Sequence, residues 1–235
     1  MTERSHHPII VAKGLTRIYQ PGGNEVIGIN NVNLEISSGE LIALKGNSGS
    51  GKSTLLALLA GLDTPSRGTL IVANNDLQQL TPVQLTQYRR KVVGMVFQTF
   101  NLLPTLTVLE NVSLPALLAG HPYARVTNKA MELLGWLNLN SRINHLPSQL
   151  SGGEMQRTAI ARALINEPAI ILADEPTGNL DTRNGEIVIE LLAELNRRFG
   201  RTVIIATHSK IADPHATLRI CLKDGSITDT ICCAP

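Results

Sequence analysis

Residues 46–53, which read GNSGSGKS, constrain the fold of this chain more than any other stretch. A strand-length apolar run at 41–44 precedes them, and an apolar run typical of a helix follows at 55–59. Glycines allow the backbone to fold back so that consecutive N–H groups converge on an anion. A helix beginning near Lys52 adds the positive end of its dipole. The sequence therefore predicts a phosphate-binding loop between a buried strand and a helix.

The side chains of this loop indicate a nucleotide that is bound together with a metal ion. Lys52 is expected to place its charge on the β- and γ-phosphates, and the Ser53 hydroxyl to coordinate Mg²⁺. A glycine-rich turn with a solvated lysine is the alternative, but the flanking strand and helix favour the phosphate loop. The residues predicted to bind the nucleotide here are Gly46, Asn47, Ser48, Gly49, Ser50, Gly51, Lys52, Ser53 and Thr54.

Buried strands alternate with helical segments along the chain. The runs at 170–173 and 203–206 are as continuously apolar as 41–44, which is typical of strands covered on both faces. Helical patterns lie between these runs. The alternation predicts an α/β fold with a mainly parallel sheet.

Local signals place a helix start, a hairpin and a helical insertion. Thr81-Pro82 is typical of an N-cap followed by proline in the first helical turn. Asp224-Gly225, between two short alternating runs, predicts a two-residue hairpin. The stretch from about 99 to 164 contains no buried strand, so we expect a helical lobe inserted into the sheet-containing core.

Two carboxylates end one of the buried strands, in the sequence IILADE at 170–175. Sheets of α/β proteins place ligand-facing groups at the carboxyl ends of their strands. Asp174 is expected to hold the Mg²⁺ sphere, and Glu175 to act as the base that activates water beside the terminal phosphate. Alone this pattern is weak, because many strands end in an acid that caps the next turn; the phosphate loop strengthens it.

The sequence LSGGEMQR at 150–157 marks a helix start, with a serine hydroxyl and two glycines that give an anion access to the backbone. A capped surface helix is the alternative. The octet resembles the signature of ATP-binding-cassette (ABC) ATPases, and together with the two motifs above it identifies a resemblance that covers about residues 9–229.

This resemblance implies an α/β fold: a P-loop NTPase (RecA-like) parallel-sheet core with an N-terminal antiparallel β subdomain and an inserted helical subdomain. The whole chain, 1–235, would form one ABC ATPase domain. Residues 9–97 and 165–230 would form the core lobe, and 99–164 the helical lobe. It also implies ATP and Mg²⁺ as ligands, and a second copy arranged head to tail, in which each signature contacts the γ-phosphate held by the other copy.

Further positions match the family individually. By resemblance, Tyr19 stacks on adenine, Gln98 reaches Mg²⁺ and the attacking water, and His208 contacts the γ-phosphate. Asp181 lies in a loop that bridges the two copies, although it is equally suited to cap a helix. The resemblance assigns nucleotide contacts to Tyr19, Ser151, Gly152, Gly153, Gln156 and Asp181, catalysis to Glu175, His208 and Gln98, and metal coordination to Ser53, Gln98 and Asp174.

Two positions depart from the family pattern. Lys45 precedes the phosphate loop where the family usually carries an apolar residue, and Ser209 follows His208 where aspartate is common. The first departure is expected to affect strand packing, and the second leaves the support of the histidine open.

Composition limits the classes of partner. The formal net charge is +2 and aromatic residues make up 3% of the 235 residues, which does not favour a nucleic-acid surface. The first ten residues carry no apolar signal-peptide core, and the longest apolar runs are far shorter than a membrane span. We therefore expect a cytoplasmic protein whose cysteines, Cys221, Cys232 and Cys233, are reduced thiols.

Three further segments resemble one branch of the family: 61–63, 98–104 and 176–181. That branch contains lipoprotein-releasing (LolD-like), macrolide-export (MacB-like) and FtsE ATPases. It implies a permease on a separate chain and a place at the cytoplasmic face of the inner membrane, with lipoprotein release, export and cell-wall signalling all open. The alternative is a soluble ABC ATPase that acts on nucleic acid or ribosomes; a single phosphate loop and the absence of a heptad stretch disfavour it. The apolar segment 101–110 is expected to line the groove that receives a permease helix.

Overall fold

The computed structural model describes residues 8–232 of the chain. Residues 1–7 lie outside the described residues. They make up most of the first ten residues, in which the sequence shows no apolar signal-peptide core. Cys233, one of the predicted reduced thiols, also lies outside them, and Cys232 is described only by its backbone. Cys221 is a free, half-buried thiol.

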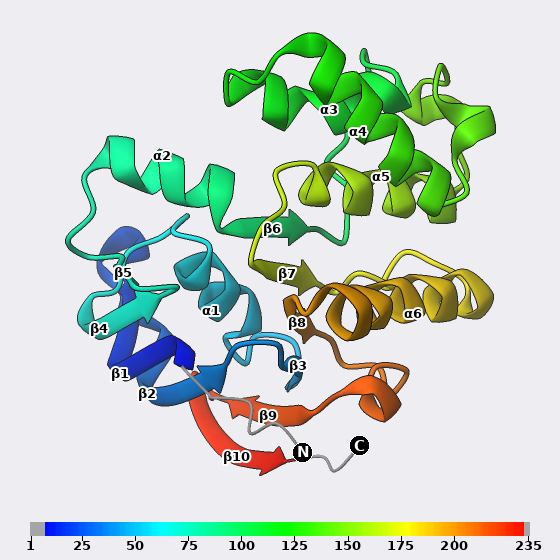
Figure 1. Cartoon of the computed structure of the whole chain (residues 1–235). Coiled ribbons are helices and arrows are strands. Elements are labelled where there is room, and N and C mark those ends of the chain that lie inside the picture. The colour runs from blue at the N-terminus through cyan, green and yellow to red at the C-terminus, as the bar shows by residue number, and fades with distance from the viewer. Residues whose placement is uncertain (1–7, 233–235) are drawn as a thin grey trace, which may run out of the picture.

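An antiparallel sheet of four strands forms one layer of the core, in the order β2-β1-β4-β5 (Figure 1). Alternating side chains of β2 are buried, including Val32, Leu34 and Ile36. This is the pattern of a strand with one face on the core. The strands are β1 (Pro8–Tyr19), β2 (Val26–Ser37), β4 (Arg67–Val72) and β5 (Asn75–Asp76).

The second sheet has six strands in the order β10-β9-β3-β8-β7-β6. All neighbouring pairs are parallel except β9 and β10, which form the hairpin predicted at Asp224-Gly225. The predicted α/β fold with a mainly parallel sheet is thereby confirmed. The strands are β3 (Leu41–Lys45), β6 (Val93–Val96), β7 (Ile170–Asp174), β8 (Thr202–Ala206), β9 (Leu218–Lys223) and β10 (Ser226–Cys232).

The parallel sheet is buried on both faces because each face belongs to a different hydrophobic cluster. In β3, Ile42 and Leu44 pack toward α1 (Lys52–Leu59) and the antiparallel sheet. Leu41 and Ala43 pack toward the other cluster, which includes side chains of α6 (Thr182–Phe199) and of the helices between residues 108 and 164. Continuous burial explains why these strands read as unbroken apolar runs.

Three helices, α3, α4 and α5, pack against one another between residues 108 and 164, and α5 also packs against β6 of the parallel sheet (Figure 1). Another helix, α2, begins at the Thr81-Pro82 signal, where Thr81 and Gln84 form a capping box. The bounds of these helices are α2 (Pro82–Lys91), α3 (Val108–Leu118), α4 (Tyr123–Trp136) and α5 (Gly152–Leu164). The 3₁₀ turns are η1 (Pro21–Gly23), η2 (Asn140–Arg142), η3 (Pro147–Gln149) and η4 (Asp213–His215).

Strand register brings the carboxyl ends of four neighbouring strands to one edge. Ala206 of β8 is paired with Leu44 of β3 on one side and with Asp174 of β7 on the other. Val96 of β6 is paired with Ala173. The segments that follow these strands, at 45–51, 97–98, 175–181 and 207–209, therefore meet at the same edge of the sheet.

Candidate functional site

The loop at 46–51 takes a conformation that requires glycine. Gly46 has a φ of 156° and Gly51 a φ of 104°. A Cβ at Gly46 would lie 2.5 Å from the carbonyl oxygen of Leu222, and one at Gly51 would lie 2.4 Å from that of Gly28. Backbone packing on both sides thus fixes the loop at the N-terminus of α1, where helix N–H groups remain available to an anion.

The side chain of Lys52 lies across this loop and is 7% exposed. Its Nζ donates hydrogen bonds to the carbonyl oxygens of Gly46, at 2.8 Å, and Asn47, at 3.1 Å. It also lies 3.7 Å from Oε1 of Glu175. The ammonium is therefore held in the loop by its own backbone, which preorganises it for an anionic ligand.

The Asp174 side chain fits a magnesium ligand. Its Oδ1 is buried and has no hydrogen-bond partner within the described residues. Burial raises the pKa of Asp174, and the neighbouring Ser53 side chain works in the opposite direction. Magnesium commonly takes one or two carboxylates from the protein and further oxygens from phosphates and water. Ser53 and Asp174 supply oxygen ligands of this kind.

Glu175 sits at the turn after β7 in the left-handed region, with a φ of 44°. Its N–H donates to the carbonyl oxygen of Ala206 at 2.9 Å, which fixes the residue beside the end of β8. His208, which follows that strand, places Nδ1 3.0 Å from Oε2 of Glu175. Few non-glycine residues adopt a positive φ, and those that do are concentrated at functional sites.

Gln98 follows β6 and packs on the turn after Glu175. A Cβ at Gly178 would lie 2.7 Å from Nε2 of Gln98, so that glycine leaves room for the amide. The side chain of Asn179 donates to the backbone oxygen of Gln98 at 3.0 Å. Gln98 therefore lies beside the turn that follows Glu175.

Tyr19, at the end of β1, is oriented by two charged residues. Its hydroxyl donates to Oδ2 of Asp63 at 2.9 Å, and the Arg17 guanidinium lies 4.6 Å from the ring centroid. Arg17 and Asp63 form a bidentate ion pair, with distances of 2.8 Å. Because Arg17 covers one face of the ring, the other face is left for a ligand.

Tyr19, Lys52, Gln98, Glu175 and His208 line one cleft of about 750 Å³. The predicted site residues Gly46, Ser50 and Asp174 are not among the residues that line it. Sequence reasoning missed three of its residues, Val26, Ile27 and Gly28, which lie at the start of β2. Val26 and Ile27 are half exposed. In the sequence, an apolar pair followed by glycine is the signal that could have indicated these residues as part of the site. The cleft is lined by Tyr19, Val26, Ile27, Gly28, Asn47, Ser48, Gly49, Gly51, Lys52, Ser53, Thr54, Gln98, Glu175 and His208.

The signature residues do not line this cleft. Ser151 caps α5 and forms a capping box with Glu154, whose Oε2 accepts from the Ser151 N–H at 2.8 Å. The Arg142 side chain donates to Oε1 of Glu154 at 2.7 Å. This hydrogen bond, with those from Ser151, lowers the pKa of Glu154 to about 2. The exposed Ser151 and half-buried Gly152 thus form a rigid helix start.

Two other residues assigned with the signature have their own contacts. Gln156 is fully buried, and its Nε2 donates to the Phe97 carbonyl oxygen at 3.4 Å. Asp181 caps α6 by accepting from the Asn184 N–H at 2.9 Å, the alternative that the sequence left open. Gln156 is therefore placed within the protein beneath the segment that leads to Gln98, and Asp181 at an exposed helix start.

Comparison with known proteins identifies the family. The model of the ABC transporter family matches residues 29–178. The chain belongs to the ABC transporter family. Its similarity to MacB proteins and to the ATP-binding cassette MJ0796 places it in the ABC ATPase branch that contains the MacB-like proteins, and confirms the P-loop NTPase fold implied by the sequence.

Curated relatives of this ABC ATPase include macrolide export ATP-binding/permease proteins named MacB. The protein from Burkholderia lata is 47% identical over 220 residues, 94% of this chain and 32% of the relative. The one from Wolinella succinogenes is 46% identical over 221 residues, 94% of this chain and 34% of the relative. The chain thus spans about a third of the length of these relatives.

Solved structures also resemble this ABC ATPase. The ATP-binding cassette MJ0796, as a dimer in a post-hydrolysis state with ADP and Pi, matches with a TM-score of 0.89 and 40% identity, covering 96% of this chain and 99% of that one. CbiO1 from Clostridium perfringens, part of the transporter complex cbiONQ, matches with a TM-score of 0.85 and 27% identity, covering 95% of this chain and 88% of that one.

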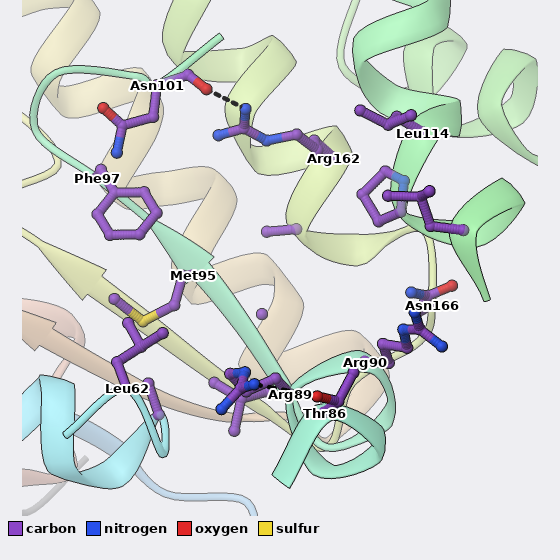
Figure 2. Close-up of a pocket in the computed structure, with 16 residues that line it drawn as sticks. Leu62, Thr86, Arg89, Arg90, Met95, Phe97, Asn101, Leu114, Arg162 and Asn166 are labelled. Atoms are coloured by element: carbon purple, nitrogen blue, oxygen red, sulfur yellow. Dashed lines mark hydrogen bonds between the residues drawn. The ribbon is translucent and has the colours of Figure 1, made fainter. Parts of the chain in front are cut away.

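A second cavity of this ABC ATPase, of about 430 Å³, lies between α2, β6, α3 and α5 (Figure 2). The Arg162 side chain donates to the carbonyl oxygens of Phe100, at 2.7 Å, and Asn101. The lining combines apolar side chains with three arginines and contains no carboxylate. Its apolar side chains include Leu62, Met95, Phe97, Leu114 and Leu118, and its arginines are Arg89, Arg90 and Arg162.

The predicted groove segment 101–110 contributes little to this cavity. Only Asn101 of that segment lines it. The Asn111 side chain instead donates to the carbonyl oxygens of Leu103, Leu106 and Thr107, at 3.1, 2.9 and 3.0 Å. These bonds fold the segment onto the start of α3.

No helix in the described part of the chain combines the length and apolar character needed to cross a membrane.

Proposed function

We propose that this chain binds and hydrolyses ATP as the nucleotide-binding subunit of a bacterial ABC transporter or mechanotransmission complex. The observation that carries the proposal is the single cleft in which Lys52, Glu175 and His208 converge at the phosphate loop. A cation, a carboxylate and an imidazole at the N-terminus of one helix suit phosphoryl transfer to water.

Each side chain has a distinct task in this proposal. Lys52 binds the β- and γ-phosphates, and Tyr19 stacks on the adenine with the face that Arg17 leaves uncovered. Ser53 and Asp174 hold Mg²⁺, which when bound neutralises charge on the phosphate oxygens. Glu175 accepts a proton from the attacking water, and Gln98 and His208 orient the groups at the terminal phosphate.

The proposed active unit contains two copies of the chain. The exposed Ser151 and the half-buried Gly152 begin α5, where the helix N–H groups suit an anion, but neither residue lines the cleft of its own chain. A second copy arranged head to tail would bring this helix start to the γ-phosphate. The dimeric MJ0796 structure, which matches 96% of this chain, supports two-copy assembly.

The second cavity is the proposed contact with a membrane permease on a separate chain. Its apolar lining suits one face of a short helix, and its three arginines favour a helix that carries acidic residues. We place the ATPase at the cytoplasmic face of the inner membrane through this contact. The MacB relatives, which are named as export ATP-binding/permease proteins, support export; lipoprotein release is the related alternative within the branch.

Phosphate release from MgATP by the purified chain, with and without Glu175→Gln, tests the hydrolytic function. The substitution removes the base but keeps the shape of the side chain, so turnover should fall about 10²- to 10⁴-fold. Binding of a fluorescent ATP analogue should persist. Glu167→Gln, at an exposed turn after α5, is the matched control and should retain turnover. Equal turnover in the wild type and Glu175→Gln would exclude the proposed role of Glu175.

A further inference from the structure

Lys45, the last residue of β3, directly precedes the phosphate loop, and only 13% of its side chain is exposed. A lysine this deeply placed at the end of a central strand needs partners for its charge. The sequence alone gave it no role, because the family pattern has an apolar residue at this position.

The partners of Lys45 both come from the segment that follows β8. Its Nζ donates to the carbonyl oxygen of Ser209 and lies 2.5 Å from Oδ1 of Asp213. Oδ2 of Asp213 is 3.6 Å from the Arg219 guanidinium, so the carboxylate is held between two cations. Asp213 is itself largely buried, with 23% of its side chain exposed. Low exposure on both sides strengthens a charge-assisted contact.

Ser209 is the neighbour of His208, whose own side chain has little packing. The imidazole is 73% exposed and meets Glu175 through Nδ1. The backbone of this turn must therefore set its position. The Ser209 N–H donates to Oγ1 of Thr207 at 3.0 Å, a bond within the turn itself, and the Thr207 N–H donates to the carbonyl oxygen of Leu44 at 3.1 Å. Beyond Thr207, Lys45 joins the turn to β3 through the carbonyl oxygen of Ser209.

We propose that Lys45 is a positioning residue for His208, a role that rests on the proposed hydrolytic function. The Lys45 ammonium links the His208 turn to β3, the strand that leads into the phosphate loop. This contact keeps the imidazole and the loop at a fixed distance from each other at the terminal phosphate. In this chain the residue after His208 is serine, and the negative charge that anchors the turn is Asp213, in η4.

Steady-state ATP hydrolysis by the full-length Lys45→Met variant tests this role. Methionine keeps the apolar stem and most of the length of lysine but cannot donate to Ser209. Since the substitution loosens the imidazole and not the phosphate loop, kcat should fall on the order of tenfold to a hundredfold, with KM for MgATP nearly unchanged. Lys45→Arg, which can still donate to both partners, should recover most of kcat.

Lys129→Met is the control for the loss of an ion pair, because it removes the contact between Lys129 of α4 and Glu167, in the turn after α5; its kcat should match that of the wild type. If Lys45→Met does not fold, Lys45→Met/Asp213→Asn removes both charges and should show the same loss of kcat. A folded variant of either kind with wild-type kcat would overturn the proposal, as would a raised KM at unchanged kcat. A wild-type chain that does not hydrolyse ATP would instead contradict the proposed function itself.

Discussion

Nζ of Lys52 and Oε1 of Glu175 lie 3.7 Å apart across the nucleotide cleft, so the proposed phosphate ligand and the proposed base form an ion pair. Phosphate oxygens that bind Lys52 compete with this contact. Nucleotide binding would therefore leave the Glu175 carboxylate free to receive a proton from water, which links occupancy of the loop to activation of the base.

Lys52→Ala is expected to weaken MgATP binding about tenfold to a hundredfold, the loss typical of a charge-assisted hydrogen bond. Titration with a fluorescent ATP analogue measures the Kd. Lys129→Ala, which removes a lysine far from this cleft, should bind as the wild type does. An unchanged Kd for Lys52→Ala would contradict the phosphate-loop assignment.

Tyr19→Ala should weaken ATP binding about threefold to tenfold, because it removes the ring on which adenine would stack. Tyr19→Phe keeps the ring and loses only the hydroxyl bond to Asp63, so its affinity should be closer to that of the wild type. Binding measurements with ATP and with inorganic triphosphate separate the base contact from the phosphate contact. Equal losses for both ligands would assign Tyr19 to the fold and not to adenine.

Glu154 should make unfolding dependent on pH. The hydrogen bond from Arg142 is the largest cause that lowers its pKa to about 2 in the folded chain, from an ordinary value of 4.5. The contribution of this carboxylate is therefore complete above about pH 4.5 and is lost as the pH falls toward 2. Glu154→Gln should lower the free energy of unfolding by about 1 kcal/mol at neutral pH, and should flatten its dependence on pH between about 4.5 and 2.

Chemical unfolding at several pH values measures both effects. Glu132→Gln, on the exposed face of α4, is the control. Parallel curves of unfolding free energy against pH for Glu154→Gln and the wild type would refute the assignment.

Leu118→Glu should disrupt the proposed permease contact, because it places a carboxylate among the apolar side chains of the second cavity. Leu118 is 63% exposed, so the fold should tolerate the change. Tagged wild type and Tyr123→Glu, an exposed position outside the cavity, should recover the same integral membrane protein from solubilised membranes, and Leu118→Glu should not. Equal recovery by Leu118→Glu would place the contact elsewhere.

Much of the core was predictable because its signals are local. The unbroken apolar run at 41–44, the hairpin at Asp224-Gly225 and the cap at Thr81 each depend on a few adjacent residues, and the structure confirms them. The convergence of Lys52 and Glu175 follows from strand order, which the family resemblance implied and the apolar runs alone did not specify.

Contacts between distant residues were not predictable in this way. Lys45 donates a hydrogen bond to Ser209, which is 164 residues away in the sequence. The pairing of β3 with β8 brings the two residues together. The same holds for Tyr19 and Asp63, which are 44 residues apart in the sequence. For the segment 101–110, which the family resemblance implies lines the groove for a permease helix, the sequence did not predict the hydrogen bonds from Asn111 to Leu103, Leu106 and Thr107.

The central claim is that the ATPase site is completed by the signature of a second copy. Light scattering of Glu175→Gln with ATP and Mg²⁺ tests it most directly, because this variant retains the shared ligand, and a ligand bound between two copies stabilises the dimer. We predict a monomeric mass without nucleotide and twice that mass with ATP. Adding Ser151→Asp, which keeps a good N-cap but sets a negative charge toward the γ-phosphate, should restore the monomer while nucleotide binding persists. A Glu175→Gln chain that stays monomeric with ATP, or a Ser151→Asp variant that dimerises equally well, would contradict the shared site.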